Sequence, residues 1–135
     1  MHTTEIEIRT QSRHVTDLTG EIEGFLRDAG AEDGLATVWV PHATAGLIVM
    51  ELGSSSETDL EELLGRLLPR DDRYAHAHGS RGHGADHLLP LLAGPSLTVP
   101  VLGGRLTLGT WQSICLLDLN DDNPRRRVRL SFLAG

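Results

Sequence analysis

The sequence predicts a single α+β domain in which a large, mostly antiparallel sheet carries about three helices. Short segments of alternating apolar and polar residues recur along the chain and end at glycine, proline or asparagine, which is typical of strands joined by turns. Two other segments repeat apolar residues at helical spacing, and a third, shorter one follows them. The length of 135 residues suits one domain, and we expect residues 1–135 to form it.

The N-terminal quarter predicts a strand and then a helix. Thr4–Thr10 alternates isoleucine with charged residues, as in a half-buried strand. Leu18–Ala29 has apolar residues at helical spacing, with Asp17 before it as a candidate cap and Gly30 after it as a candidate terminator.

Two apolar strands and a leucine-rich helix are predicted next. The strands are Leu35–Val40 and Gly46–Glu51, and we expect this pair near the centre of the sheet. Ser54 and Glu57 have the spacing of a capping box, and the leucine stripe that follows ends at Pro69.

The second half predicts a polar loop over Arg70–Gly84 and a short helix over Ala85–Ala93. Three strands follow: Ser96–Val101 and Arg105–Leu108, which a Gly-Gly turn joins as a hairpin, and Ser113–Leu119. The last of these is apolar on both faces and therefore reads as a central strand. A final strand covers Arg125–Leu133.

Composition excludes several classes of function. The net charge of −7 argues against a nucleic-acid-binding protein, which normally has a basic face. All 12 basic residues are arginine, so mechanisms that need a lysine are excluded. Cys115 lies in the most apolar strand and reads as a small core residue. No apolar run approaches the length of a membrane span, and no signal peptide is evident, so we expect a cytoplasmic protein without a membrane partner.

Histidines are the residues most suggestive of chemistry. Four of the seven lie within a dozen residues, at His76, His78, His83 and His87. Neutral imidazoles are common ligands of zinc, and an i, i+4 pair shares one face of a helix. The alternative is a solvated loop in which histidines serve as turn residues, and the spacing leaves open whether His78 and His83 belong to a site.

Two further residues favour a metal site. His42 lies between two apolar strands, and Glu51 follows the second of them, so each has an ordinary structural explanation on its own. Together with the loop histidines they supply nitrogen and oxygen ligands for a divalent metal, or a base with its orienting partner. Asp86 either orients His87 or caps the helix. The basic cluster 125–127 reads as surface charge, although guanidinium groups also suit phosphate.

Several motifs occur together in this chain: HATAG from His42, Glu51, YAH ending at His76, His87, and LTLGTWQ ending at Gln112. From about residue 6 to the C-terminus they resemble the YjbQ-like family, also called the secondary thiamine-phosphate synthase family. The sequence departs from the family's commoner pattern at Ala43, where threonine is frequent, and at Met50, where asparagine often precedes the glutamate. Any polar role of those two positions is absent here.

The resemblance implies a compact α+β domain that assembles as a homotrimer, with histidines near subunit boundaries. It also implies a transferase activity that joins a pyrimidine diphosphate to a thiazole phosphate and releases pyrophosphate. The residues that match the family's pattern are His42, Glu51, His76, His87, Trp111 and Gln112.

From these observations we expect a divalent metal, zinc or magnesium, bound mainly by His42, His76 and His87. Glu51 would act as acid/base, and Trp111 with Gln112 would shape a pocket for a small phosphorylated substrate. Taken alone, the tryptophan reads more readily as a core or interface residue. A metal-dependent hydrolase, a non-catalytic trimeric protein that binds metal or a phosphorylated ligand, and a purely structural trimer remain open.

Overall fold

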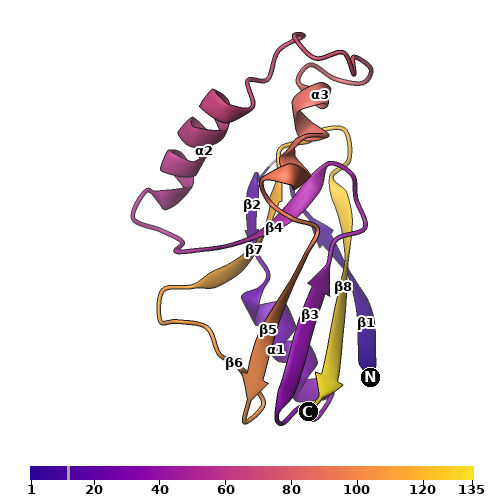
Figure 1. Ribbon diagram of the computed structural model, residues 1–135, viewed down its shortest axis with the longest axis vertical. Helices are drawn as coiled ribbons and strands as arrows, with labels where there is room; N and C mark the ends of the chain where they lie inside the picture. The colour runs from indigo at the N-terminus through magenta and orange to yellow at the C-terminus, as the bar shows by residue number, and fades with distance from the viewer. Residues whose placement is uncertain (12) are drawn as a thin grey trace.

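The structure, a computed structural model, describes residues 1–11 and 13–135 and confirms the predicted α+β class. These residues form two antiparallel sheets with helices beside and above them, so the predicted strands are divided between two sheets (Figure 1). The strands are β1 (His2–Arg9), β2 (Val15–Asp17), β3 (Gly34–Trp39), β4 (Ala45–Met50), β5 (Ser96–Leu102), β6 (Arg105–Leu106), β7 (Ser113–Asp118) and β8 (Arg125–Ala134). The helices are α1 (Thr19–Asp28), α2 (Ser56–Leu67) and α3 (His83–Asp86), and Leu89–Leu91 forms a 3₁₀ turn.

The strand order is β1-β8-β3-β5-β6 in the larger sheet and β2-β7-β4 in the smaller one. β7 is the middle strand of its sheet and is buried at every residue except Ser113, as its continuous apolar run predicted. β3 lies inside the larger sheet, between β8 and β5. β4 is an edge strand of the smaller sheet, so the expectation that both strands lie near the centre of one sheet was wrong for β4.

A neighbouring loop explains why the edge strand β4 is apolar. The backbone N–H of Leu47 donates to the carbonyl of Gly94 at 2.8 Å, on the side of β4 that has no strand partner. At Gly46 an added Cβ would lie 1.7 Å from the carbonyl oxygen of Ala93. The segment before β5 therefore covers β4 closely, and the sequence pattern of a covered edge resembles that of a central strand.

The C-terminal end of α1 agrees with the sequence, whereas its N-terminal end does not. The N-cap residue is Leu18 and no side chain caps the helix, so the expectation that Asp17 caps it was wrong. Asp17 lies one residue earlier, where its Oδ1 accepts the N–H of Thr19 at 2.9 Å and places an acidic group near the helix start. Gly30 follows the helix with φ +61, the left-handed conformation that glycine adopts most easily. Ile22 and Leu26 of α1 are buried in the larger hydrophobic core, together with residues of the five-stranded sheet.

Helix α2 begins differently from the predicted capping box. The carboxylate of Glu57 accepts the backbone N–H of Gly53 at 3.1 Å, and no side-chain cap comes from the serines before the helix. In Figure 1 α2 stands away from the five-stranded sheet. Only part of its leucine stripe is buried. Leu64 is buried, whereas Leu63 and Leu67 are about half exposed.

The remaining segments follow the predicted order. The helix expected over residues 85–93 is divided into α3 and the 3₁₀ turn, where Pro90 occupies an N-terminal position that needs no amide hydrogen. The turn between β5 and β6 has Gly103 and Gly104 at φ +56 and +75, which confirms the predicted hairpin. In the part of the chain that the structure describes, no helix is long and apolar enough to cross a membrane.

Candidate metal centre

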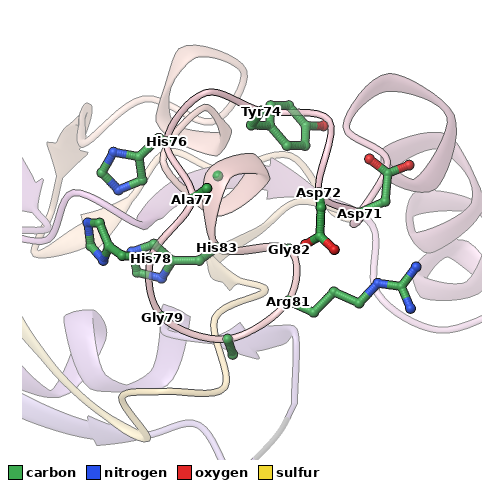
Figure 2. Close-up of a pocket in the computed structure, with 12 residues that line it drawn as sticks. Asp71, Asp72, Tyr74, His76, Ala77, His78, Gly79, Arg81, Gly82 and His83 are labelled. Atoms are coloured by element: carbon green, nitrogen blue, oxygen red, sulfur yellow. The ribbon is translucent and has the colours of Figure 1, made fainter.

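Four imidazoles gather where the loop after α2 meets α3. We call His76, His78, His83 and His87 the histidine cluster. The ring centroid of His76 lies 4.2 Å from that of His78 and 4.3 Å from that of His87, and the rings of His83 and His87 are 4.6 Å apart. Figure 2 shows His76, His78 and His83 on one side of the loop. The loop and α3 therefore bring together side chains that the sequence only placed in one segment.

Three members of the cluster offer ring nitrogens that converge. One nitrogen each of His76, His83 and His87 lies within 4.8 Å of the others. The Nε2 atoms of His83 and His87 are 2.9 Å apart, a hydrogen-bonded distance. Zinc–nitrogen bonds of about 2.0–2.1 Å place tetrahedral ligand nitrogens about 3.3–3.4 Å apart. Small side-chain movements would therefore suit this group to a zinc ion.

The electrostatic setting favours a neutral imidazole at His87. Burial lowers the pKa of His87 from its usual value, and the neighbouring imidazoles of His76, His83 and His78 lower it further. A neutral ring keeps a lone pair on one nitrogen, which is the form that binds metal. Burial, together with the neighbouring histidines, therefore keeps His87 in its ligand form near neutral pH.

Glycines shape the loop that carries the cluster. Gly79 and Gly82 adopt φ values of +78 and +86, which residues with a side chain rarely adopt. At Gly84 an added Cβ would lie 2.6 Å from the Cβ of Tyr74. The Tyr74 hydroxyl donates to the carbonyl of Pro69 at 2.8 Å and so connects the loop to the end of α2. The loop encloses a cavity of about 260 Å³, lined by residues between 71 and 84 (Figure 2).

A buried polar network holds α3 in place behind the cluster. Asp86 is fully buried, and its two carboxylate oxygens accept from Arg70 Nη1 and from Asn120 Nδ2, the latter at 2.9 Å. Asp86 therefore neither caps the helix nor contacts His87 through its carboxylate, the two roles that the sequence suggested. It joins α3 to the loop and to the segment after β7.

His42 lies outside the converging group. It occupies the link between β3 and β4, where its Nε2 accepts the backbone N–H of Arg127 at 2.8 Å. Burial lowers the pKa of His42, and the charges of Arg126 and Arg127 lower it further. In this geometry the ring is neutral and carries its proton on Nδ1. Of the three expected ligands, the structure of one chain thus brings together His76 and His87. The role of His42 as a ligand stays a prediction.

The three consecutive arginines have different environments. Arg126 is buried, and its guanidinium donates to the two oxygens of Asp118 at 2.6 and 3.0 Å and to Thr44 Oγ1 at 2.9 Å. Arg125 and Arg127 are exposed, because residues two positions apart in a strand share a face and Arg126 between them points to the opposite one. The interpretation of this cluster as surface charge was therefore wrong for Arg126, because strand alternation directs its side chain inward.

Glu51, Trp111 and Gln112 lie at the other end of the smaller sheet. Met50 of β4 pairs with Ser113 of β7, so the neighbouring residues Glu51 and Gln112 come together just beyond that pair. Gln112 Oε1 accepts the N–H of Gly109, and Trp111 is 73% exposed. β7 extends about 17 Å from this end to the end beside the histidine cluster. A single chain therefore separates these three residues from the converging histidines.

Sequence reasoning did not identify the polar residues that follow β7. Asn120 contacts both Asp86 and His83, and Asp122 lies 3.4 Å from His83 Nδ1. The sequence signals at His83 were its place in the histidine-rich segment and its i, i+4 spacing from His87. Asn120 and Asp122 read as turn residues, because nothing in their local pattern indicates a contact about 35 to 40 residues away.

Comparisons with known proteins cover the whole chain. Residues 4–135 match the family described as "UPF0047 protein YjbQ-like". UPF0047 protein Rv2556c of Mycobacterium tuberculosis is 58% identical over 135 residues, which is 100% of each chain. A UPF0047 protein of Methanothermobacter thermautotrophicus is 36% identical over 137 residues, which is 100% of this chain and 93% of the relative. The crystal structure of hypothetical protein APE1520 from Aeropyrum pernix K1 has a TM-score of 0.91 at 33% identity and covers 100% of both chains.

Proposed function

The chain belongs to the UPF0047 YjbQ-like family, and we propose that it is a metal-dependent enzyme that acts on a small phosphorylated substrate. The observation that carries the proposal is the convergence of ring nitrogens from His76, His83 and His87 within 4.8 Å. Such a group matches the three-nitrogen sites of catalytic zinc, which leave a further position for substrate. His78 lies beside this group and completes its polar surroundings.

The donor set favours zinc over magnesium. Magnesium prefers oxygen ligands in near-ideal octahedral geometry, whereas imidazole nitrogen suits zinc and similar metals. The converging donors here are all nitrogen atoms of His76, His83 and His87. Of the two divalent metals expected from the sequence, we therefore propose zinc.

The reaction we propose is the one that the family resemblance implies, the joining of a pyrimidine diphosphate to a thiazole phosphate with release of pyrophosphate. A divalent ion held by the cluster would supply positive charge that neutralises the leaving pyrophosphate. Glu51, exposed after β4, is suited to exchange a proton with the substrate, and the exposed indole of Trp111 offers a flat face for an aromatic ring. A metal-dependent hydrolase would use the same residues.

We also propose that the protein works as a homotrimer with sites shared between chains. Two observations support assembly: Glu51, Trp111 and Gln112 lie about 17 Å of strand away from the cluster in one chain, and large apolar side chains remain at the surface. The exposed apolar residues include Trp39, Leu63, Leu67, Leu91, Leu92 and Trp111. A neighbouring copy would cover these residues and bring one chain's Glu51 towards another chain's histidines.

Metal binding is tested with tag-free protein, elemental analysis and zinc titration. We expect about one zinc per chain, its loss in His87→Ala, and its retention in His2→Ala, which removes a histidine of β1 outside the cluster. Absence of zinc from the wild type after titration, or equal binding by His87→Ala, would refute the metal site.

Catalysis is tested by pyrophosphate release from the two phosphorylated substrates with zinc present. Glu51→Gln is expected to lower the rate about 10²–10⁴-fold, the usual contribution of a general acid or base. An unchanged rate would favour the non-catalytic binding protein, and phosphate release without joining would favour the hydrolase.

Light scattering measures the number of chains in the assembly, for which we expect three. Recovery of activity on mixing dissociated Glu51→Gln and His87→Ala chains is expected only for shared sites.

A further inference from the structure

Two side chains compete for one nitrogen of His83. The side chain of His83 is 14% exposed, and its Nδ1 lies 3.3 Å from Asn120 Nδ2 and 3.4 Å from Asp122 Oδ2. The first neighbour is a hydrogen-bond donor and the second is an acceptor. The nitrogen can satisfy only one of them at a time, so its choice depends on which ring nitrogen carries the proton.

The orientation of the Asn120 amide is determined by two other hydrogen bonds. Its Oδ1 accepts the backbone N–H of Asp122 at 3.1 Å, and its Nδ2 donates to the buried carboxylate of Asp86 at 2.9 Å. Rotating the amide would break both bonds and leave Asp86 facing an oxygen. Asn120 therefore presents a donor to His83 and cannot accept a proton from it.

Metal binding determines whether His83 Nδ1 forms a hydrogen bond with Asn120 or with Asp122. If His83 binds metal through Nε2, the nitrogen that faces His87, its remaining proton must lie on Nδ1. Asn120 cannot accept that proton, whereas the carboxylate of Asp122 can. We propose that Asp122 is the positioning residue of the metal centre, which accepts the Nδ1–H of His83 and so directs its Nε2 lone pair at the ion. This inference rests on the metal site proposed above.

The surroundings of Asp122 are built for this contact. Its Oδ2 accepts from the hydroxyl of Ser80 at 2.9 Å and from the backbone N–H of Ser80 at 3.3 Å. These two hydrogen bonds hold the carboxylate of Asp122 in place beside His83. At Gly79 an added Cβ would lie 2.9 Å from His83 Nδ1 and 3.2 Å from Asp122 Oδ2. The loop therefore leaves room for the imidazole and the carboxylate to meet.

A carboxylate behind a ligating histidine fixes the ring and makes its nitrogen more basic, and its loss commonly lowers metal affinity 10–100-fold. We would measure zinc affinity by competition with a chromophoric chelator for the full-length wild type and for Asp122→Asn, Asp122→Glu, Asp121→Asn and Ser80→Ala. Asp121→Asn makes the same charge change at the adjacent exposed residue. Ser80→Ala removes the hydroxyl that connects the loop to Asp122 without touching the carboxylate.

The expected result is a 10–100-fold weaker zinc affinity in Asp122→Asn and partial rescue in Asp122→Glu. Asp121→Asn should keep an affinity close to wild type, and Ser80→Ala, which removes one of the bonds that hold Asp122, should lose less affinity than Asp122→Asn. Long-range ¹⁵N NMR of the zinc-loaded wild type should place the His83 proton on Nδ1. Wild-type affinity in Asp122→Asn, an equal loss in Asp121→Asn or Ser80→Ala, or a proton on Nε2 would overturn this inference and leave the metal site standing. Failure of the wild type to bind zinc would overturn both.

Discussion

Replacing Arg126 by methionine tests how much the buried ion pair between Arg126 and Asp118 contributes to the stability of the fold. Arg126 and Asp118 have side chains 3% and 1% exposed, and two hydrogen bonds of 2.6 and 3.0 Å join them. Asp118 Oδ1 also accepts the N–H of Asn120, which anchors the network behind the histidine cluster. Arg126→Met keeps much of the volume and leaves the Asp118 charge buried without its partner.

The expected cost follows from the burial of the pair. Removing one partner of a buried ion pair typically costs about 3–5 kcal/mol, because the remaining charge stays desolvated. A domain of this size is stable by about 5–15 kcal/mol, so the loss is a large share of the total. The double variant Arg126→Met, Asp118→Asn removes the orphan charge and keeps an oxygen for Asn120. We expect it to be more stable than Arg126→Met alone.

Urea unfolding at pH 7.5, at one protein concentration for all variants, measures these differences. The matched control is Arg129→Met on the same strand. Arg129 pairs with Glu5 at 3.0 Å, but the two side chains are 46% and 33% exposed, and such surface pairs contribute about 0–1 kcal/mol. A cost for Arg126→Met no larger than that for Arg129→Met would refute the reasoning, as would a double variant less stable than the single one.

Three further predictions concern packing, pH and reactivity. Gly46→Ala should lower the free energy of unfolding in urea by about 3 kcal/mol or more, because the new Cβ would lie 1.7 Å from a carbonyl oxygen. The control Gly20→Ala, in open space on α1, should raise it by about 0.5–1 kcal/mol. Similar values for both variants would contradict the close approach at Gly46. The pKa of His42 is lowered, chiefly by burial, so the unfolded chain binds a proton below about pH 6.5 that the folded chain does not. The contribution of neutral His42 to stability is therefore complete above about pH 6.5 and is lost as the pH falls towards the folded pKa. From pH 7 to 5, His42→Gln should lose less unfolding free energy than the wild type does. An equal slope for the two proteins would argue against a lowered pKa. Burial raises the pKa of Cys115 to about 12, so iodoacetamide at pH 8 should label it only after unfolding, as mass spectrometry would show.

The sequence predicted the features that depend on neighbouring residues. The hairpin at the Gly103-Gly104 turn, the glycine after α1 and the buried strand β7 all follow from local backbone preference and apolar pattern. The density of histidines also indicated where a site would lie. The geometry of the ligands at that site could not be predicted from the sequence, because spacing alone does not say how a loop of about a dozen residues folds back on α3.

Tertiary structure decided which polar groups are buried and which site residues meet. The basic run around Arg126 reads as surface charge until strand register turns one guanidinium inward, onto Asp118. β4 reads as a central strand until the loop at Gly94 is seen to cover its edge. Asn120 and Asp122 become neighbours of His83 only when β7 ends beside α3. Local pattern indicates which apolar residues are covered. Which polar groups are buried, and which segment covers an apolar strand, depends on contacts between segments far apart in the chain.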